Sequence, residues 1–132
     1  MEILVIDDEL ISRKKLIAIL ERYGNCNEMD TGTDALNYYT ESINDGKKID
    51  LITLDVSMDG VDGLTVLYRI RVNERRMGLK PDQCSKIVMI TSDRSNETHE
   101  KALSMGCDHY LVKPVTNRDL VGWMESQHMV GA

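Results

Sequence analysis

Short apolar runs alternate with longer segments of helical periodicity along the whole chain. Three runs, at residues 3–6, 51–54 and 87–90, are nearly continuous and contain many β-branched side chains. Runs of this kind are typical of strands that are buried on both faces of a sheet. A weak, short run at residues 26–29 and an apolar run at residues 110–112 predict two further strands.

The segments between these runs carry apolar side chains at helical spacing and predict five helices. Gly24 and Gly106 are placed to end the first and fourth helices, and the turn-like residues 44–46 close the second. Thr116 and Asp119 are spaced as a capping box at the start of the fifth helix. The fourth helix is expected at residues 95–105, and the apolar stripes of the others are Leu16, Ile19, Leu20 and Tyr23; Ala35, Leu36, Tyr39 and Ile43; Leu64, Leu67 and Ile70; and Leu120, Trp123 and Met124.

The stretch between the third helix and the fourth strand, residues 73–85, predicts an exposed connection, because it contains Gly78, Pro81 and many charged side chains. Five strands that alternate strictly with five helices predict an α/β fold. The expected architecture is a doubly wound, five-stranded parallel sheet of (βα)5 type with helices on both faces. The length of 132 residues fits one domain, so residues 1–132 are expected to form a single unit.

Composition and charge argue against several classes of partner. The formal net charge is −6, whereas direct binding to nucleic acid or to an anionic membrane surface needs a basic face. No apolar stretch approaches the ~20 residues that span a bilayer, and no leader of basic and then apolar residues precedes the first strand. The three cysteines are odd in number and lack metal-ligand spacing, so we expect free thiols and a cytoplasmic location.

Charged side chains mark the ends of three predicted strands. Asp7 and Asp8 follow the first strand, Asp55 follows the third, and Lys113 follows the fifth. The carboxyl ends of parallel strands point to the same edge of an open α/β sheet, and ligands bind at that edge. Three carboxylates suit a hard divalent cation, and a nearby lysine suits a phosphate. The sequence therefore predicts a site for both at this edge.

Four motifs at the strand ends extend this picture. They are Val5-Ile6-Asp7-Asp8-Glu9; Leu54-Asp55 with Met58 and Asp62-Gly63-Leu64; Ile90-Thr91-Ser92; and Gly106-Cys107-Asp108-His109-Tyr110-Leu111-Val112-Lys113-Pro114. In this order and at these separations, the motifs resemble those of the receiver domains of two-component response regulators. The resemblance covers about the whole chain and implies the flavodoxin-like fold of the chemotaxis type.

The resemblance also implies a function, phosphorelay signal transduction. Asp55 matches the residue that accepts a phosphoryl group from a sensor histidine kinase or a phosphotransfer protein. Asp7, Asp8 and Asp55, with the backbone carbonyl of Ser57, are implied to hold Mg2+, with Mn2+ as an alternative ion. Lys113 is implied to contact the phosphoryl group, and its peptide bond to the following proline is usually cis in the family. The chain would be no enzyme beyond its own phosphorylation and dephosphorylation.

The resemblance further assigns a switch and a control of phosphoryl lifetime. Thr91 matches the switch hydroxyl and Tyr110 the switch aromatic, and both are implied to reshape the face of the fourth helix, fifth strand and fifth helix for an unidentified protein partner. Ser57 and Asp93 lie two residues after Asp55 and Thr91, so they are expected to flank the path of the attacking water. The simpler interpretation of Asp93 is that it only caps the following helix.

The chain departs from the family pattern at three positions. Asp59 stands where proline commonly follows the position of Met58, and Ser92 and Cys107 stand where alanine is typical. These changes affect loop geometry and partner contacts, but they remove no chemical group that the site needs.

Three other functions are weighed against this one. A Mg2+-dependent phosphohydrolase also forms an aspartyl-phosphate, but it usually carries Asp-x-Asp after its first strand, whereas Asp7 and Asp8 are adjacent. A phosphorylation-independent interaction module is disfavoured by the complete acidic set together with Thr91 and Lys113. An FMN carrier is disfavoured because a phosphate-binding loop after Ile6 would be rich in hydroxyl groups and glycine.

Overall fold

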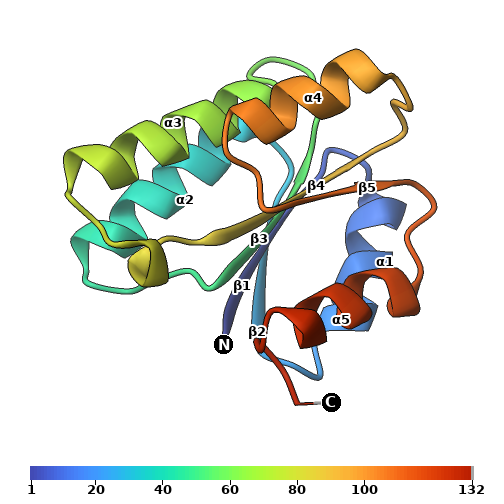
Figure 1. Ribbon diagram of the computed structural model, residues 1–132, viewed down its shortest axis with the longest axis horizontal. Helices are drawn as coiled ribbons and strands as arrows, with labels where there is room; N and C mark the ends of the chain where they lie inside the picture. The colour runs from blue at the N-terminus through green and yellow to red at the C-terminus, as the bar shows by residue number, and fades with distance from the viewer. Residues whose placement is uncertain (132) are drawn as a thin grey trace.

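Five parallel strands form one sheet in the order β2-β1-β3-β4-β5 (Figure 1). The structure is a computed structural model that describes residues 1–131. The strands are β1 (Glu2–Ile6), β2 (Asn25–Met29), β3 (Leu51–Asp55), β4 (Lys86–Thr91) and β5 (His109–Val112). The predicted doubly wound α/β fold is confirmed, and the strand that the sequence marked as weak, β2, lies at one edge of the sheet.

Helices cover both faces of this sheet (Figure 1). Two helices pack on one face and three on the other, so the central strands have no exposed side. The first face carries α1 (Leu10–Leu20) and α5 (Asn117–Ser126), and the second carries α2 (Gly32–Asn44), α3 (Gly63–Arg76) and α4 (Asn96–Ser104).

Alternate side chains of each central strand enter two separate apolar cores. Ile52 and Leu54 of β3 join the core beneath α2, α3 and α4, whereas Ile3 of β1 and Leu51 of β3 join the core beneath α1 and α5. Burial of each such side chain stabilises the fold by about 1.5–3 kcal/mol. This double burial explains why the central strands appear in the sequence as continuous apolar runs.

Side-chain caps fix where four of the helices, α2 to α5, begin. The Asp62 carboxylate accepts a hydrogen bond from the Thr65 amide (2.8 Å), and this contact starts α3 directly after the Asp55 loop. Thr116 accepts from the amide of Asp119 (3.1 Å), which is one of the two hydrogen bonds of the expected capping box. Ser95 caps α4 in the same way. Such caps contribute about 1 kcal/mol each.

The end of the first helix differs from the prediction, because α1 stops at Leu20, before Gly24. Gly24 instead passes close to the first residue. A Cβ atom at this position would lie 2.2 Å from the backbone oxygen of Met1, which also accepts a hydrogen bond from the Asn25 amide. The glycine therefore permits close approach of two backbone segments and does not cap the helix.

The prediction of an exposed connection over residues 73–85 is wrong in part. The third helix continues to Arg76, and Glu74 is only 3% exposed. Ser85 is buried as well, and a short 3-10 turn, η1 (Pro81–Gln83), lies between them. The prediction failed because it took charged residues to be exposed. A carboxylate can be buried when it is fully hydrogen-bonded.

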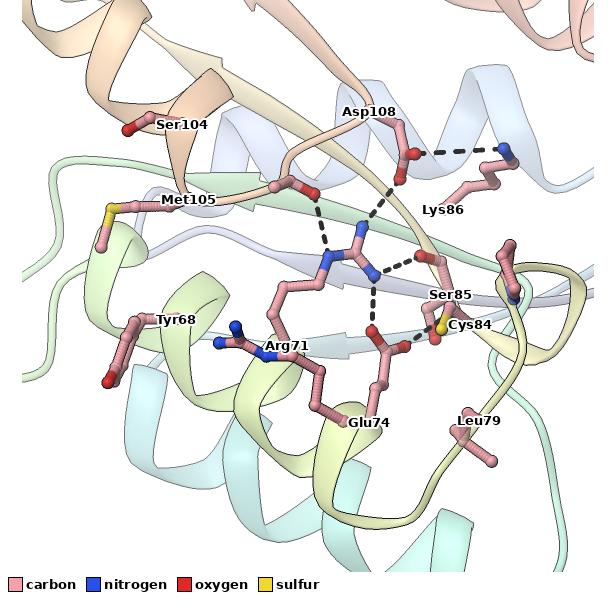
Figure 2. Close-up of a pocket in the computed structure, with 13 residues that line it drawn as sticks. Tyr68, Arg71, Glu74, Leu79, Cys84, Ser85, Lys86, Ser104, Met105 and Asp108 are labelled. Carbon is pink, nitrogen blue, oxygen red and sulfur yellow. Dashed lines mark hydrogen bonds and ion pairs between the residues drawn. The ribbon is translucent and has the colours of Figure 1, made fainter.

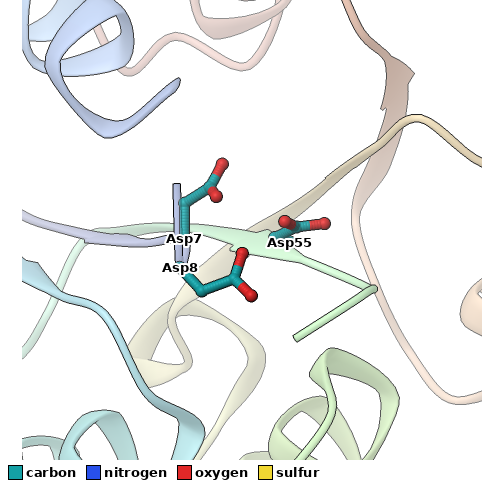
Figure 3. A group of neighbouring side chains, drawn as sticks. All are labelled: Asp7, Asp8 and Asp55. Atoms are coloured by element: carbon teal, nitrogen blue, oxygen red, sulfur yellow. The ribbon is translucent and has the colours of Figure 1, made fainter. Parts of the chain in front are cut away.

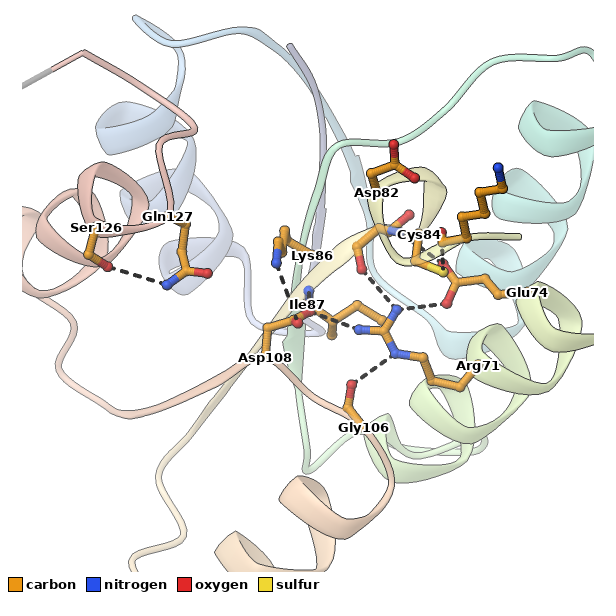
Figure 4. A network of polar contacts seen from close by, with 12 residues as sticks. Arg71, Glu74, Asp82, Cys84, Lys86, Ile87, Gly106, Asp108, Ser126 and Gln127 are labelled. Carbon is orange, nitrogen blue, oxygen red and sulfur yellow. Dashed lines mark hydrogen bonds and ion pairs between the residues drawn. The ribbon is translucent and has the colours of Figure 1, made fainter. Parts of the chain in front are cut away.

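The guanidinium of Arg71 is the centre of the network that buries Glu74 (Figure 4). Its Nη1 atom donates to Glu74 Oε1 (2.7 Å) and to the Ser85 backbone oxygen (2.8 Å). Its Nε atom donates to the Gly106 oxygen (2.9 Å), and Nη2 donates to Asp108 Oδ2 (2.8 Å). One planar fork thus joins α3, the start of β4 and the α4–β5 loop.

Residues 1–131 contain no helix with the length and apolar character that a bilayer crossing requires. All three cysteines, Cys26, Cys84 and Cys107, are free thiols, as the sequence predicts.

Candidate functional site

The carboxyl ends of β1 and β3 bring Asp7, Asp8 and Asp55 together at one edge of the sheet (Figure 3). One carboxylate oxygen from each residue lies within 4.8 Å of the others. Asp7 and Asp55 are buried, whereas Asp8 is exposed. The trio that the strand ends predict is therefore assembled in space, with one side open to solvent.

Local hydrogen bonds fix the two buried carboxylates. Asp7 Oδ1 accepts from the Glu9 amide (2.9 Å), and the backbone oxygen of Asp7 accepts from Arg13 Nη1 (2.9 Å). Asp55 Oδ1 accepts from the amide of Ser57 (3.1 Å). Each carboxylate is thus held by the chain that follows it, and each keeps its second oxygen for other partners.

Lys113 reaches this edge from the end of β5. Its ammonium nitrogen donates to Asp7 Oδ2 (2.9 Å), Glu9 Oε1 (3.2 Å) and Asp55 Oδ2 (3.4 Å). The peptide bond between Lys113 and Pro114 is cis, as the resemblance implied. Lys113 therefore lies where it can meet a group attached to Asp55.

The electrostatics of the edge are unfavourable for Asp55 in the absence of an added cation. Burial raises the pKa of Asp55, the Lys113 ammonium opposes this shift, and Asp7 adds to it, so that the pKa is about 6. Burial alone would lower the pKa of Lys113, but its hydrogen bond to Asp7 and the charge of Asp55 outweigh burial and raise it. Further positive charge near Asp55 would therefore stabilise its ionised form.

An excess of negative charge is the observation that fits a divalent cation. Lys113 forms ion pairs with Asp7, Glu9 and Asp55. Asp8, the third carboxylate of the trio, forms no ion pair within residues 1–131. Oxygen ligands of this kind are those that Mg2+ prefers, and an exposed side leaves space for the waters that Mg2+ retains. Ser57 lies exposed beside the trio, so its backbone carbonyl stays a predicted ligand.

Glu9 is the residue at this edge to which the sequence reasoning assigned no role. Its exposed carboxylate accepts a hydrogen bond from the Lys113 ammonium. Glu9 and Asp7 thus hold this ammonium together. Its position directly after the acidic pair was the signal that could have identified it.

Thr91 and Tyr110 are linked through the backbone of Asp93. The buried Thr91 hydroxyl accepts a hydrogen bond from the Asp93 amide (3.1 Å). The half-buried Tyr110 hydroxyl donates to the Asp93 backbone oxygen (3.1 Å). The His99 ring of α4 stacks on the Tyr110 ring, with centroids 4.4 Å apart. A change at Thr91 can therefore reach Tyr110 and α4 through the backbone of a single residue, Asp93.

The Asp93 carboxylate is bound to the first turn of α4. Its Oδ2 atom accepts from the Thr98 hydroxyl (2.7 Å) and its Oδ1 atom accepts from the Ser95 amide (2.8 Å). These hydrogen bonds, led by that from Thr98, lower the pKa of Asp93. The N-cap residue of α4 is Ser95, so Asp93 does not cap the helix itself as the simpler interpretation supposed, but it holds the cap residue and the first turn in place.

Comparison with known proteins decides the family. The model of the response regulator receiver domain family matches residues 3–125. The chain belongs to this family. The receiver domain is 31% identical over 121 residues to the chemotaxis protein CheY of Treponema pallidum (strain Nichols). This alignment covers 90% of this chain and 76% of that protein. It is 33% identical over 117 residues to the sensor histidine kinase RcsC of Escherichia coli, which covers 88% of this chain.

Solved structures agree with this placement. The co-crystal structure of the Saccharomyces cerevisiae histidine phosphotransfer protein Ypd1 with the receiver domain of its downstream response regulator Ssk1 contains a similar chain. That match has a TM-score of 0.79 at 25% identity, and it covers 95% of this receiver domain and 90% of the other chain. The receiver domain is thus a signalling module of two-component systems. It spans only 11% of RcsC, so the activities of that whole kinase are not transferred to it.

Proposed function

We propose that this receiver domain accepts a phosphoryl group on Asp55 in a Mg2+-dependent phosphorelay step. The observation that supports this proposal is the buried Asp55 carboxylate between Lys113, 3.4 Å away, and the acidic pair Asp7 and Asp8. The donor is a sensor histidine kinase or a phosphotransfer protein. Mg2+, or Mn2+ in its place, is held by Asp7, Asp8, Asp55 and the Ser57 carbonyl.

In the transfer step an Asp55 oxygen attacks the phosphorus, the new oxygen–phosphorus bond forms, and the nitrogen–phosphorus bond to the donor histidine breaks. The bound ion supplies positive charge that offsets repulsion between the carboxylate and the phosphoryl oxygens. Lys113 exchanges its contact with Asp55 for a phosphoryl oxygen, while Asp7 and Glu9 keep its ammonium in place. Positioning and neutralisation of this kind account for most of the catalysis of phosphoryl transfer.

The phosphorylated state acts through a change in Thr91 and its neighbours. The Thr91 hydroxyl turns to donate to a phosphoryl oxygen and releases the Asp93 amide. The Asp93 backbone then shifts, and Tyr110 loses the carbonyl that holds its hydroxyl. The face of α4, β5 and α5 thereby changes shape for a downstream protein partner. Water hydrolyses the acyl phosphate and ends the signal.

The beginning of α1 offers a docking surface for the phosphodonor. Leu10 and Ile11 are exposed apolar side chains only a few residues after Asp8. A donor that presents its histidine to Asp55 must cover this part of the edge. Apolar contact there would hold the donor in line with the reacting oxygen.

Two alternatives make different predictions. A phosphohydrolase would turn over a small phosphomonoester, whereas a receiver domain modifies only itself. A phosphorylation-independent module would bind its partner equally well after Asp55→Asn, and the charge excess around Asp55 argues against it.

The first prediction is direct phosphorylation. With Mg2+ and acetyl phosphate, the intact protein should gain the mass of one phosphoryl group, and Asp55→Asn should abolish the gain because an amide is no nucleophile here. The exposed loop variant Asp59→Asn is the matched control and should be modified like the original chain. An equal gain in the Asp55→Asn protein would refute the proposal.

The second prediction concerns the switch. A beryllofluoride adduct on Asp55, which stands in for the phosphoryl group, should shift amide NMR signals from α4 through α5. Thr91→Ala should confine the shifts to the loops around Asp8 and Asp55, because the link through Asp93 is lost. Confined shifts in the unsubstituted protein would show that Thr91 and Tyr110 are not coupled.

The third prediction concerns lifetime. Asp93→Leu should shield the acyl phosphate and slow its decay severalfold, at a cost in stability of about 1 kcal/mol from the lost hydrogen bonds to Ser95 and Thr98. Ser95→Ala is the control, because it removes a cap of α4 without adding bulk near Asp55. Decay curves recorded after donor removal distinguish the two effects. Identical dephosphorylation rate constants in both variants would show that Asp93 only stabilises the start of α4.

A further inference from the structure

The outer surface of α3 and the turn after it combine apolar and cationic side chains. Tyr68 is 52% exposed and Met77 is 45% exposed. Arg69, Arg75 and Arg76 are exposed around them. We call these five residues the α3 face. Tyrosine and arginine are the side chains that most often dominate the energy of protein interfaces.

Two grooves meet at Tyr68. A groove of about 640 Å3 lies between α3 and the end of α4, with Arg75, Leu79 and Met105 among its lining residues. Figure 2 shows Tyr68 and Met105 at one end of this groove and the network of Arg71 at its floor. A second groove of about 520 Å3 lies between α2 and α3, where Leu36 and Val72 form part of its lining. The ring of Tyr68 therefore stands between two hollows that each have apolar and cationic side chains in their lining.

The cations of the α3 face lack partners. Within residues 1–131, Arg69, Arg75 and Arg76 form no ion pair. The carboxylates in the larger groove, Glu74 and Asp108, are already bound by Arg71, and the lining of the smaller groove includes no carboxylate. Three exposed arginines thus gather on a chain whose net charge is −6.

We propose that the α3 face binds an acidic amphipathic peptide segment of a partner protein. Apolar side chains of that segment enter the grooves on either side of Tyr68. Its carboxylates pair with Arg69, Arg75 and Arg76, whose guanidinium groups suit bidentate contact. A polyanion such as a nucleic acid is disfavoured, because the remaining surface of this acidic chain would repel it.

This surface is separate from the phosphorylation edge. The third helix begins beside Asp55 and runs back toward the amino ends of the strands, so Arg75 and Arg76 lie at its far end. Binding at the α3 face requires no chemistry at Asp55. The proposal therefore stands or falls independently of the proposed function.

The test is selection of binders on the full chain from a display library of random peptides of about 16 residues, a length that permits helix formation. The enriched peptides should be acidic and should carry aromatic or aliphatic residues at helical spacing. Arg69→Gln/Arg75→Gln/Arg76→Gln should weaken binding of the best peptide about tenfold or more. Tyr68→Ala should weaken it to a similar extent.

A matched variant, Arg22→Gln/Lys47→Gln/Arg118→Gln, removes three exposed cations elsewhere and should bind within about twofold of the original chain. Thermal unfolding of each variant checks that the fold is intact. Three results would overturn the proposal: no acidic enrichment, an equal loss in the matched variant, or tighter binding of a single-stranded oligonucleotide that the same arginine substitutions abolish.

Discussion

Arg71→Met is expected to destabilise the protein by about 3–5 kcal/mol, since it leaves a buried charge without its partner. Glu74 is 3% exposed and depends on Arg71 for its ion pair, although it also accepts a hydrogen bond from the amide of Ser85. The Gly106 and Ser85 backbone oxygens lose donors in the same step. A loss of this size is a large share of the stability of a small domain.

Two further variants distinguish the loss of the ion partner of Glu74 from a general disruption of α3. Arg71→Met/Glu74→Gln should recover a substantial part of the loss, because no uncompensated charge remains. Arg75→Met, one helical turn later on the exposed side, should stay within about 0.5 kcal/mol of the original chain. Urea unfolding measures all three. A loss below about 1 kcal/mol in Arg71→Met would show that the network does not hold Glu74 as a charged group.

Asp55→Asn is expected to stabilise the ion-free protein at neutral pH. The pKa of Asp55 is about 6 in the folded state against a usual value of 3.8, because burial disfavours its charged form. When the pKa of a carboxyl group is higher in the folded state, its contribution to stability is fully present at pH values below its unfolded-state pKa. That contribution is lost as the pH rises through its folded-state pKa. The free energy of unfolding of Asp55→Asn should therefore rise relative to that of the original chain between about pH 4 and 7, by up to about 3 kcal/mol.

Denaturant unfolding of both proteins across this pH range, in a chelator, measures the effect. Asp59→Asn serves as the control and should give a flat difference, since that side chain is exposed. Mg2+ should reduce the advantage of Asp55→Asn, because the ion stabilises the original chain by binding its charged trio. A difference that does not change with pH would contradict the placement of Asp55 in a desolvated, negatively charged site.

Much of the fold was predictable because the strands and helices of this chain have distinct periods. The central strands are buried on both faces, so β3 could be recognised from its apolar run alone. The charged stretch before β4 could not be predicted correctly. Its burial depends on Arg71 meeting groups from two distant segments, the start of β4 and the α4–β5 loop, and no local pattern contains that information.

The site was predictable to a similar degree and for a similar reason. Parallel strands end at one edge, so the positions of Asp7, Asp55 and Lys113 in sequence were sufficient to place them together. The contact between Glu9 and Lys113 and the bridge through the Asp93 backbone depend on side-chain and loop geometry. Sequence reasoning could name Thr91 and Tyr110, but it could not show how they are joined.

The most direct test of the proposed phosphoacceptor is to locate the phosphoryl group. The receiver domain is treated with Mg2+ and acetyl phosphate, reduced with borohydride, digested and mapped by mass spectrometry. Borohydride converts an aspartyl phosphate to homoserine, so we expect homoserine at position 55, present only when Mg2+ and the donor are both supplied. Homoserine at another aspartate, or its absence from position 55 under these conditions, would show that Asp55 is not the phosphoacceptor.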